Sequence, residues 1–171
     1  AVTFTVSLAN IIKELTLETL YMPGSPEEVL ISSRDVSRPG LEFTGFFEYY
    51  DNTRVLIIGN TEHAFLARFS PEERYHALSE LLSRRPPAII ISRNLEPFEE
   101  LMATAKENDV PILRTADTTS SLVAALVSYM NVELAPRITR HGVLVEVYGE
   151  GLLLVGDSGV GKSETAIELI K

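Results

Sequence analysis

The sequence contains no cysteine. It therefore forms no disulfide and offers no thiolate ligand for zinc, and a cysteine-free composition is typical of cytoplasmic proteins. No run of residues approaches the ~20 consecutive apolar residues that a membrane-spanning helix needs, so we expect no membrane span. The opening residues, AVTFTVSLANIIKEL, lack a basic start followed by a long apolar block, so we also expect no signal peptide. Together these absences predict a cytoplasmic protein with no membrane partner.

Positive charge is scarce in this chain. Its 171 residues include 15 lysines and arginines against 24 aspartates and glutamates, a formal net charge of −9 at pH 7. An acidic surface repels the phosphate backbone of nucleic acids, so we expect no nucleic acid partner. A partner with a basic surface suits this charge better.

Residues 1–131 alternate apolar runs with helical patterns. Buried strands are predicted at VLIS (29–32), RVLIIGN (54–60), AIIIS (88–92) and VPILRT (110–115). Helices are predicted at 8–15 after a Ser7 cap, at 61–68, at 70–84, at 95–108 and from Asp117 onward as the cap of a long helix. Continuous apolar strands that alternate with helices are typical of a sheet covered on both faces. We therefore predict an N-terminal α/β domain with a parallel or mixed sheet flanked by helices.

The pattern changes after residue 131. Residues 132–140 have no clear period and contain a proline, so we interpret them as a linker. Two apolar strands then surround the sequence Gly-Glu-Gly at 149–151, which predicts a hairpin. The second strand leads into GDSGVGKSETAIELIK, residues 156–171. We therefore expect residues 141–171 to begin a second domain with a hairpin, a loop and a helix.

The loop GDSGVGKS matches the phosphate-binding pattern G-x-x-x-x-G-K-[ST] without a mismatch. Its glycines let backbone N–H groups close around phosphates, and the helix that follows directs its positive end at the anion. Lys162 is expected to contact the β- and γ-phosphates of ATP, and Ser163 to supply a hydroxyl to Mg²⁺. The predicted nucleotide-binding residues are Gly156, Asp157, Ser158, Gly159, Val160, Gly161, Lys162 and Ser163. The structural alternative is a glycine-rich turn with a surface lysine, and the loop alone does not identify a reaction.

The longer segment RHGVLVEVYGEGLLLVGDSGVGKSETAIELIK (140–171) closely resembles the bacterial HPr kinase/phosphorylases. SRPGLEFTGFF (37–47) is similar to an Arg-Pro-Gly region of that family, and VPILRTADTTSSLVAALVSYMNVELAPR (110–137) is similar to the segment that leads to its kinase domain. The resemblance implies an enzyme that uses ATP and Mg²⁺ to phosphorylate a serine of the phosphocarrier protein HPr in carbon catabolite repression. The same enzymes remove that phosphate by phosphorolysis. The resemblance also implies a cytoplasmic homo-hexamer with an N-terminal α/β domain and a C-terminal P-loop kinase domain.

The resemblance assigns roles to three residues of this sequence. Lys162 and His141 match active-site residues of the family, and Ser163 matches its magnesium ligand. From the sequence alone, a solvated histidine at a strand end is the favoured interpretation of His141, and the resemblance reverses it. The family's catalytic aspartate, its active-site arginine and its acidic metal ligand have no counterpart in residues 1–171, so we expect this chain by itself to be inactive.

Two other functions stay open at this point. One is a non-enzymatic sensor or assembly module whose phosphate loop is incidental. The other is an unrelated P-loop nucleotide hydrolase.

Two further features of the N-terminal part can be interpreted. His63 and His76 lie in charged helical surroundings and are predicted to be surface residues. Five aromatic residues between 43 and 50 favour a core or a subunit interface over a ligand platform: Phe43, Phe46, Phe47, Tyr49 and Tyr50.

Overall fold

The computed structural model describes residues 4–135 of the chain. Its helices are α1 (Leu8–Leu15), α2 (Asn60–Ala67), α3 (Pro71–Leu82), α4 (Glu99–Asn108) and α5 (Thr119–Glu133), with the short 3₁₀ helices η1 (Pro26–Glu28) and η2 (Leu41–Thr44). Its strands are β1 (Val6–Ser7), β2 (Glu18–Tyr21), β3 (Leu30–Ile31), β4 (Val36–Ser37), β5 (Val55–Ile58), β6 (Ile89–Ile91) and β7 (Ile112–Arg114).

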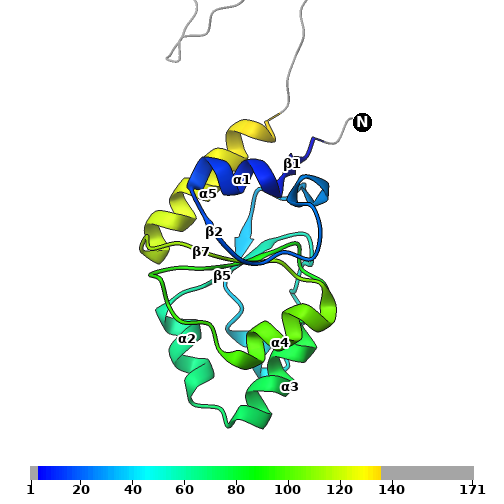
Figure 1. The fold of residues 1–171 in the computed structure, drawn as a ribbon, viewed down its shortest axis with the longest axis vertical. Helices are drawn as coiled ribbons and strands as arrows, with labels where there is room; N and C mark the ends of the chain where they lie inside the picture. The colour runs from blue at the N-terminus through cyan, green and yellow to red at the C-terminus, as the bar shows by residue number, and fades with distance from the viewer. Residues whose placement is uncertain (1–3, 136–171) are drawn as a thin grey trace, which may run out of the picture. The chain divides into compact units, whose positions relative to one another are not determined.

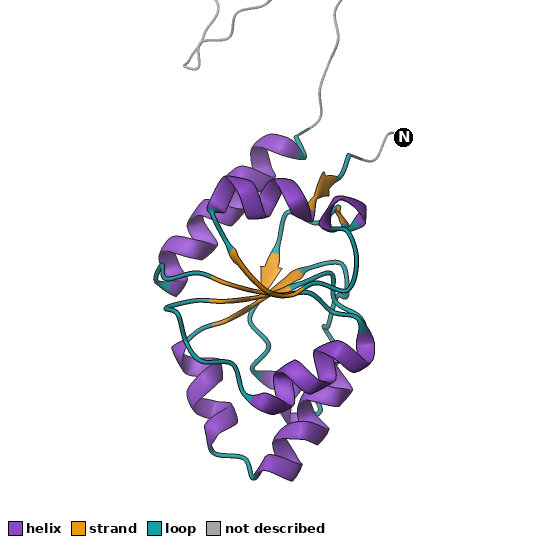
Figure 2. Cartoon of the chain, in the orientation of Figure 1, coloured by secondary structure: helices purple, strands orange, loops and turns teal. Residues whose placement is uncertain are grey.

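A five-stranded sheet with the order β2-β7-β6-β5-β4 separates two layers of helices. Helices α1 and α5 cover one face, and α2, α3 and α4 cover the other (Figure 1). Figure 2 shows the strands fanning out between these two helical layers. This arrangement confirms the predicted α/β fold with helices on both faces of the sheet.

The sheet is mixed rather than purely parallel. Strands β4, β5, β6 and β7 run parallel to one another, and β2 pairs antiparallel with β7. Glu18 of β2 lies opposite Arg114 of β7, and the pairing shifts register between Thr19 and Tyr21. An antiparallel pair such as β2 and β7 does not require the crossover connection that a parallel pair needs.

The central strands are apolar throughout because both of their faces are buried. Along β5, Val55 and Ile57 belong to the core under α1 and α5, whereas Leu56 and Ile58 belong to the core under α2, α3 and α4. The side chains of β6 alternate in the same way. Alternating strand residues point to opposite faces, so a strand between two helical layers needs an apolar residue at every position.

Polar residues at the helix N-termini satisfy free backbone N–H groups. Ser7 accepts from the backbone N–H of Asn10 at the start of α1, as predicted. Ser70 and Glu73 form a reciprocal capping box at the start of α3. The cap of α5 is Thr118, not Asp117 as predicted, because Thr118 accepts from the N–H of Ser121.

The structure corrects the prediction of a buried strand at 29–32. Only two residues of this run form a strand, β3, which pairs with β1 in a separate two-stranded sheet. Ile31 is buried, but Leu30 is 58% exposed. The strands β1, β2 and β4 were not predicted, because each is short and carries a polar or charged residue.

Residues 136–171 lie outside the described residues, and so do the predicted hairpin, phosphate loop and final helix. Within residues 4–135 no helix is long and apolar enough to cross a membrane.

Candidate functional site

The nucleotide site predicted from the sequence is the loop at residues 156–163. This loop, with Lys162 and Ser163, lies outside the described residues, as does His141. The assignment of these residues to ATP, Mg²⁺ and catalysis therefore stays a prediction.

The carboxyl edge of the parallel sheet gathers polar residues from several strand ends. Arg38 follows β4, Gly59 follows β5 and Ser92 follows β6. Parallel strands end at the same edge, so these residues become neighbours although they lie far apart in sequence. In open α/β sheets ligands usually bind at this edge, so it is a candidate site.

Glu62 is the centre of this edge. Its side chain is only 6% exposed, and the Arg38 side chain is 43% exposed. Arg38 binds both carboxylate oxygens, with Nη2 at 3.0 Å from Oε1 and Nε at 3.0 Å from Oε2. The backbone N–H of Gly59 also donates to Oε1, at 2.8 Å. The carboxylate thus joins the end of β5 to the segment after β4, and a buried charge with this many donors is well compensated.

A second contact joins the same edge to α5. The hydroxyl of Thr119, in the first turn of that helix, lies 2.6 Å from Ser92 Oγ, and both residues are buried. Gly59 packs so closely on this threonine that a Cβ atom added to the glycine would overlap Thr119 Oγ1. A glycine is therefore required here by space, since its φ of −112° is open to any residue.

Five residues of this edge have polar groups that are paired with one another: Arg38, Gly59, Glu62, Ser92 and Thr119. The carboxylate of Glu62 holds Arg38 and Gly59, and the hydroxyls of Ser92 and Thr119 hold each other. In the part of the chain that the structure describes, no group of three or more histidines, aspartates or glutamates could hold a metal ion. We conclude that this edge is a structural lock.

Sequence reasoning missed this lock. The strand ending in Gly-Asn at 59–60 was visible, but the partner of Glu62 lies 24 residues earlier in the chain. The Arg-Pro-Gly sequence that begins at Arg38 was noticed only as a family resemblance. Its first residue proves to be the ion-pair partner of a buried acid.

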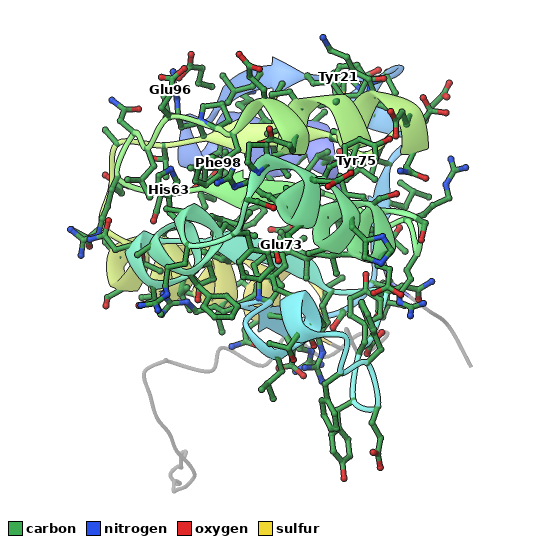
Figure 3. The ribbon with its side chains drawn as sticks, turned by 90° about the horizontal axis from the view of Figure 1, so that it is seen from below. Tyr21, His63, Glu73, Tyr75, Glu96 and Phe98 are labelled. Atoms are coloured by element: carbon green, nitrogen blue, oxygen red, sulfur yellow. The ribbon has the colours of Figure 1, made fainter. Side chains whose placement is uncertain are left out.

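The two histidines of the described region behave differently. His76 is exposed, as predicted. His63 is half-buried: its ring stacks on Phe98 at 4.5 Å between centroids, and its Nε2 lies 3.0 Å from the carbonyl oxygen of Glu96 (Figure 3). His63 thus stays at the surface in part, but a partner 35 positions along the chain covers one face of its ring, which the sequence did not predict.

Arg74 also contacts Phe98 and holds neighbouring elements together. Its guanidinium lies 4.4 Å from the Phe98 ring centroid and 3.1 Å from Glu100 Oε1. It also donates to the carbonyl oxygens of Leu66 and Phe69, each at 2.8 Å. One half-buried arginine thus connects the end of α2 and the loop after it to α3 and α4, which is a role in stability.

The aromatic residues between 43 and 50 divide between core and surface. Phe43 is 4% exposed, whereas Phe46 and Tyr49 are 40% and 81% exposed. Phe47 and Tyr50 are half-buried and meet edge to face at 5.8 Å. Burial raises the pKa of Tyr50 to about 12. The core interpretation is confirmed for Phe43, and the subunit-interface interpretation of the others stays a prediction.

Comparison with known proteins identifies the family. Residues 6–130 match the family described as HPr Serine kinase N terminus, and residues 132–171 match the HPr Serine kinase C-terminal domain. The chain belongs to the HPr serine kinase family. The two matches together cover the described α/β domain and the undescribed segment that contains the phosphate loop.

Relatives within the HPr serine kinase family are similar along nearly the whole chain. A protein named HPr kinase/phosphorylase from Caldicellulosiruptor bescii is 49% identical over 168 residues, which are 98% of this chain and 54% of that protein. Proteins of the same name from Lachnoclostridium phytofermentans and Listeria welshimeri are 45% and 46% identical over 98% and 99% of this chain. Each again is matched over 54% of its own length. The chain thus spans about half the length of the curated relatives it matches.

One solved structure with a similar fold comes from outside the family. It is the crystal structure of the CBS and DRTGG domains of the regulatory region of a Clostridium perfringens pyrophosphatase, complexed with the activator diadenosine tetraphosphate. The TM-score is 0.54 at 16% identity, over 81% of this chain and 52% of the other. At this identity the likeness concerns the fold alone.

Proposed function

We propose that this chain is part of an ATP- and Mg²⁺-dependent serine kinase/phosphorylase that acts on HPr in carbon catabolite repression. The observation that carries the proposal is the uninterrupted sequence GDSGVGKS at 156–163, inside a segment that matches the family's C-terminal domain. The names of the relatives support HPr as the substrate. Phosphoryl transfer by such enzymes depends mainly on positioning and on neutralising phosphate charge.

The proposed roles follow from the residue types of the loop. Backbone N–H groups of residues 156–161 would hold the phosphates, and Lys162 would neutralise charge on the β- and γ-phosphates. Ser163 would bind Mg²⁺, and His141 would be a further active-site residue by family resemblance. We assign residues 1–131 to a regulatory α/β domain, 132–140 to a linker and 141–171 to the start of the kinase domain. The proposed assembly is a cytoplasmic homo-hexamer.

The proposal is tested by phosphorylation of purified HPr with radiolabelled ATP and Mg²⁺. A chain extended to the full length of its relatives should label HPr, and the 171-residue chain should not. Lys162→Ala in the longer chain should reduce labelling by at least about 100-fold, since removal of one charge-stabilising group typically costs that much. Lys106→Ala, an exposed lysine of α4, is the control and should leave labelling unchanged.

Two results would contradict the assignment. Labelling that persists in Lys162→Ala would remove the proposed role of that lysine. ATP consumption by the longer chain without transfer to HPr would indicate a nucleotide hydrolase instead of a protein kinase.

A further inference from the structure

The segment from η2 onward exposes several large apolar side chains. Leu41, Phe46 and Tyr49 are 62%, 40% and 81% exposed. Figure 3 shows this cyan part of the chain projecting away from the helices that cover the sheet. Scattered single apolar residues are normal on a surface, whereas several exposed apolar residues close together are typical of a binding surface.

A cavity of about 620 Å³ opens between this segment and α3. Its apolar part is formed by Phe43, Phe69 and Ala77, and its acidic part by carboxylates of α3. Phe43 and Ala77 are 4% and 6% exposed, so the apolar part is a well-packed floor. The acidic residues Glu72, Glu73 and Glu80 of α3 also line the cavity, and all three are exposed. A cavity of this size accommodates a long side chain or a small organic group.

The carboxylates at the rim have no cation of their own. The carboxylates of Glu72 and Glu80 take part in no hydrogen bond or ion pair within residues 4–135, and the carboxylate of Glu73 accepts only from the backbone N–H of Ser70. Arg74, the arginine nearest in sequence to Glu72 and Glu73, is occupied by Glu100 and by two backbone carbonyl groups. Arg84, the arginine nearest to Glu80, lies over the Phe47 ring at 3.6 Å from its centroid. These carboxylates do not form a metal-binding group in the described part of the chain, so a single ion does not suit them.

We propose that this η2–α3 surface, made of the cavity and the exposed residues Leu41, Phe46 and Tyr49, binds a basic segment of a partner protein. A lysine or arginine side chain of the partner would enter the cavity with its aliphatic stem on the phenylalanine floor and its charged head among the carboxylates. An apolar side chain beside it would contact the exposed residues after η2. Binding energy would come from the apolar contacts, and the acidic rim would supply selectivity.

Charge favours this occupant over a second copy of the chain. The protein has a net charge of −9, and an identical surface would bring the same uncompensated carboxylates into contact. Like charges placed face to face oppose association, whereas a basic partner is steered toward an acidic surface.

The test uses the isotope-labelled 171-residue chain and the peptide acetyl-Lys-Phe-Lys-Leu-Lys-amide as the probe. Nuclear magnetic resonance should show shifts of backbone amides at the cavity, around Gly45 and His76, as the peptide is added. The matched peptide with glutamate in place of each lysine should produce no shifts. Raising the salt concentration should weaken binding of the basic peptide, because surface charges are screened.

Two pairs of variants localise the binding. Glu72→Gln with Glu80→Gln should weaken binding about fivefold, whereas Glu27→Gln with Glu28→Gln, the same charge change on η1, should change it less than about twofold. Leu41→Ser should weaken binding about threefold, since it removes an apolar contact. Leu30→Ser is its control, because Leu30 is 58% exposed and lies outside the surface. Glu73 is left intact in every variant because it caps α3.

Four results would overturn the proposal. Absence of localised shifts would show that the surface does not bind a basic segment. An equal loss of affinity in Glu27→Gln with Glu28→Gln would mean that only the total charge of the protein determines binding. Binding of spermidine as tight as that of the peptide would assign the cavity to a free polyamine. Self-association that strengthens in Glu72→Gln with Glu80→Gln, measured by sedimentation, would assign the surface to a second copy.

Discussion

Gly59→Ala is the sharpest test of the lock at the carboxyl edge of the sheet. The added Cβ atom would overlap Thr119 Oγ1 and would lie 3.1 Å from Thr119 Cγ2 and 3.2 Å from Arg38 Nη2. Thr119 has little room to retreat, because it is 6% exposed and its hydroxyl is held by Ser92. Either the first turn of α5 shifts away from the sheet, or the threonine rotates and loses that hydrogen bond.

The size of the effect follows from these contacts. Overpacking of a filled site typically costs about 1–3 kcal/mol, and loss of one buried hydrogen bond adds about 0.5–1.5 kcal/mol. Replacing glycine by alanine offsets about 0.4–1 kcal/mol through the unfolded state, since a φ of −112° suits alanine. We therefore expect Gly59→Ala to lower the free energy of unfolding by about 2 kcal/mol.

The assay is urea unfolding followed by far-ultraviolet circular dichroism. Gly24→Ala is the control, because no atom lies within 4 Å of a Cβ added there, and its stability should change by less than about 0.5 kcal/mol. The double variant Gly59→Ala with Thr119→Ala should lose at least about 1 kcal/mol less than the sum of the single losses, since removal of the threonine relieves the overlap. If Gly59→Ala unfolds at the urea midpoint of the control, or if the cycle is additive, the steric argument is refuted.

Three further predictions concern single side chains. Arg74→Lys should lower the free energy of unfolding by about 2 kcal/mol in the same urea assay, because an ammonium group cannot span two carbonyls, Glu100 and an aromatic ring at once; an unchanged midpoint would contradict it. Thr53→Val should raise the pKa of Asp51 in a carbon-13 titration of its carboxyl group, since the Thr53 hydroxyl and then its backbone N–H hold that pKa below its usual value. A carboxyl with a lowered pKa stabilises the fold above its unfolded pKa and ceases to do so as pH falls through the folded pKa, so the variant should also lose less stability on acidification; an unmoved titration would exclude this cause. Glu62→Gln should lower the free energy of unfolding by roughly 1–2 kcal/mol, less than the loss of a fully buried ion pair, because the Arg38 side chain is 43% exposed. A gain in stability would show that the ion pair is dispensable.

The parts of the fold that the sequence could predict are those whose pattern is local. Strands β5 and β6 are buried on both faces, so every position is apolar and the run is visible without knowing its neighbours. Helix α3 carries its own start signal in Ser70 and Pro71. The short strands β2 and β4 depend on pairing with β7 and β5, which is a tertiary relation that the residues themselves do not encode.

The same distinction applies to the candidate sites. The phosphate loop is a contiguous motif, so it could be predicted from eight adjacent residues at 156–163. The lock around Glu62 combines residues from three strand ends and the first turn of α5, and no local pattern joins them. The ring contact of His63 could not be predicted for the same reason, because its stacking partner Phe98 lies at the start of another helix.

The antiparallel strand β2 bears on how this domain behaves at high concentration. A sheet with open edges is a template for strand addition, and regular, flat, uncharged edges are the most prone to it. In the described domain one edge is β2, where Glu18 is bound to Arg114 and the pairing shifts register, and the other is β4, which has only two residues. A charge, an irregular ladder and a very short strand each oppose the docking of a further strand. Both edges of this sheet therefore disfavour its growth into fibrils.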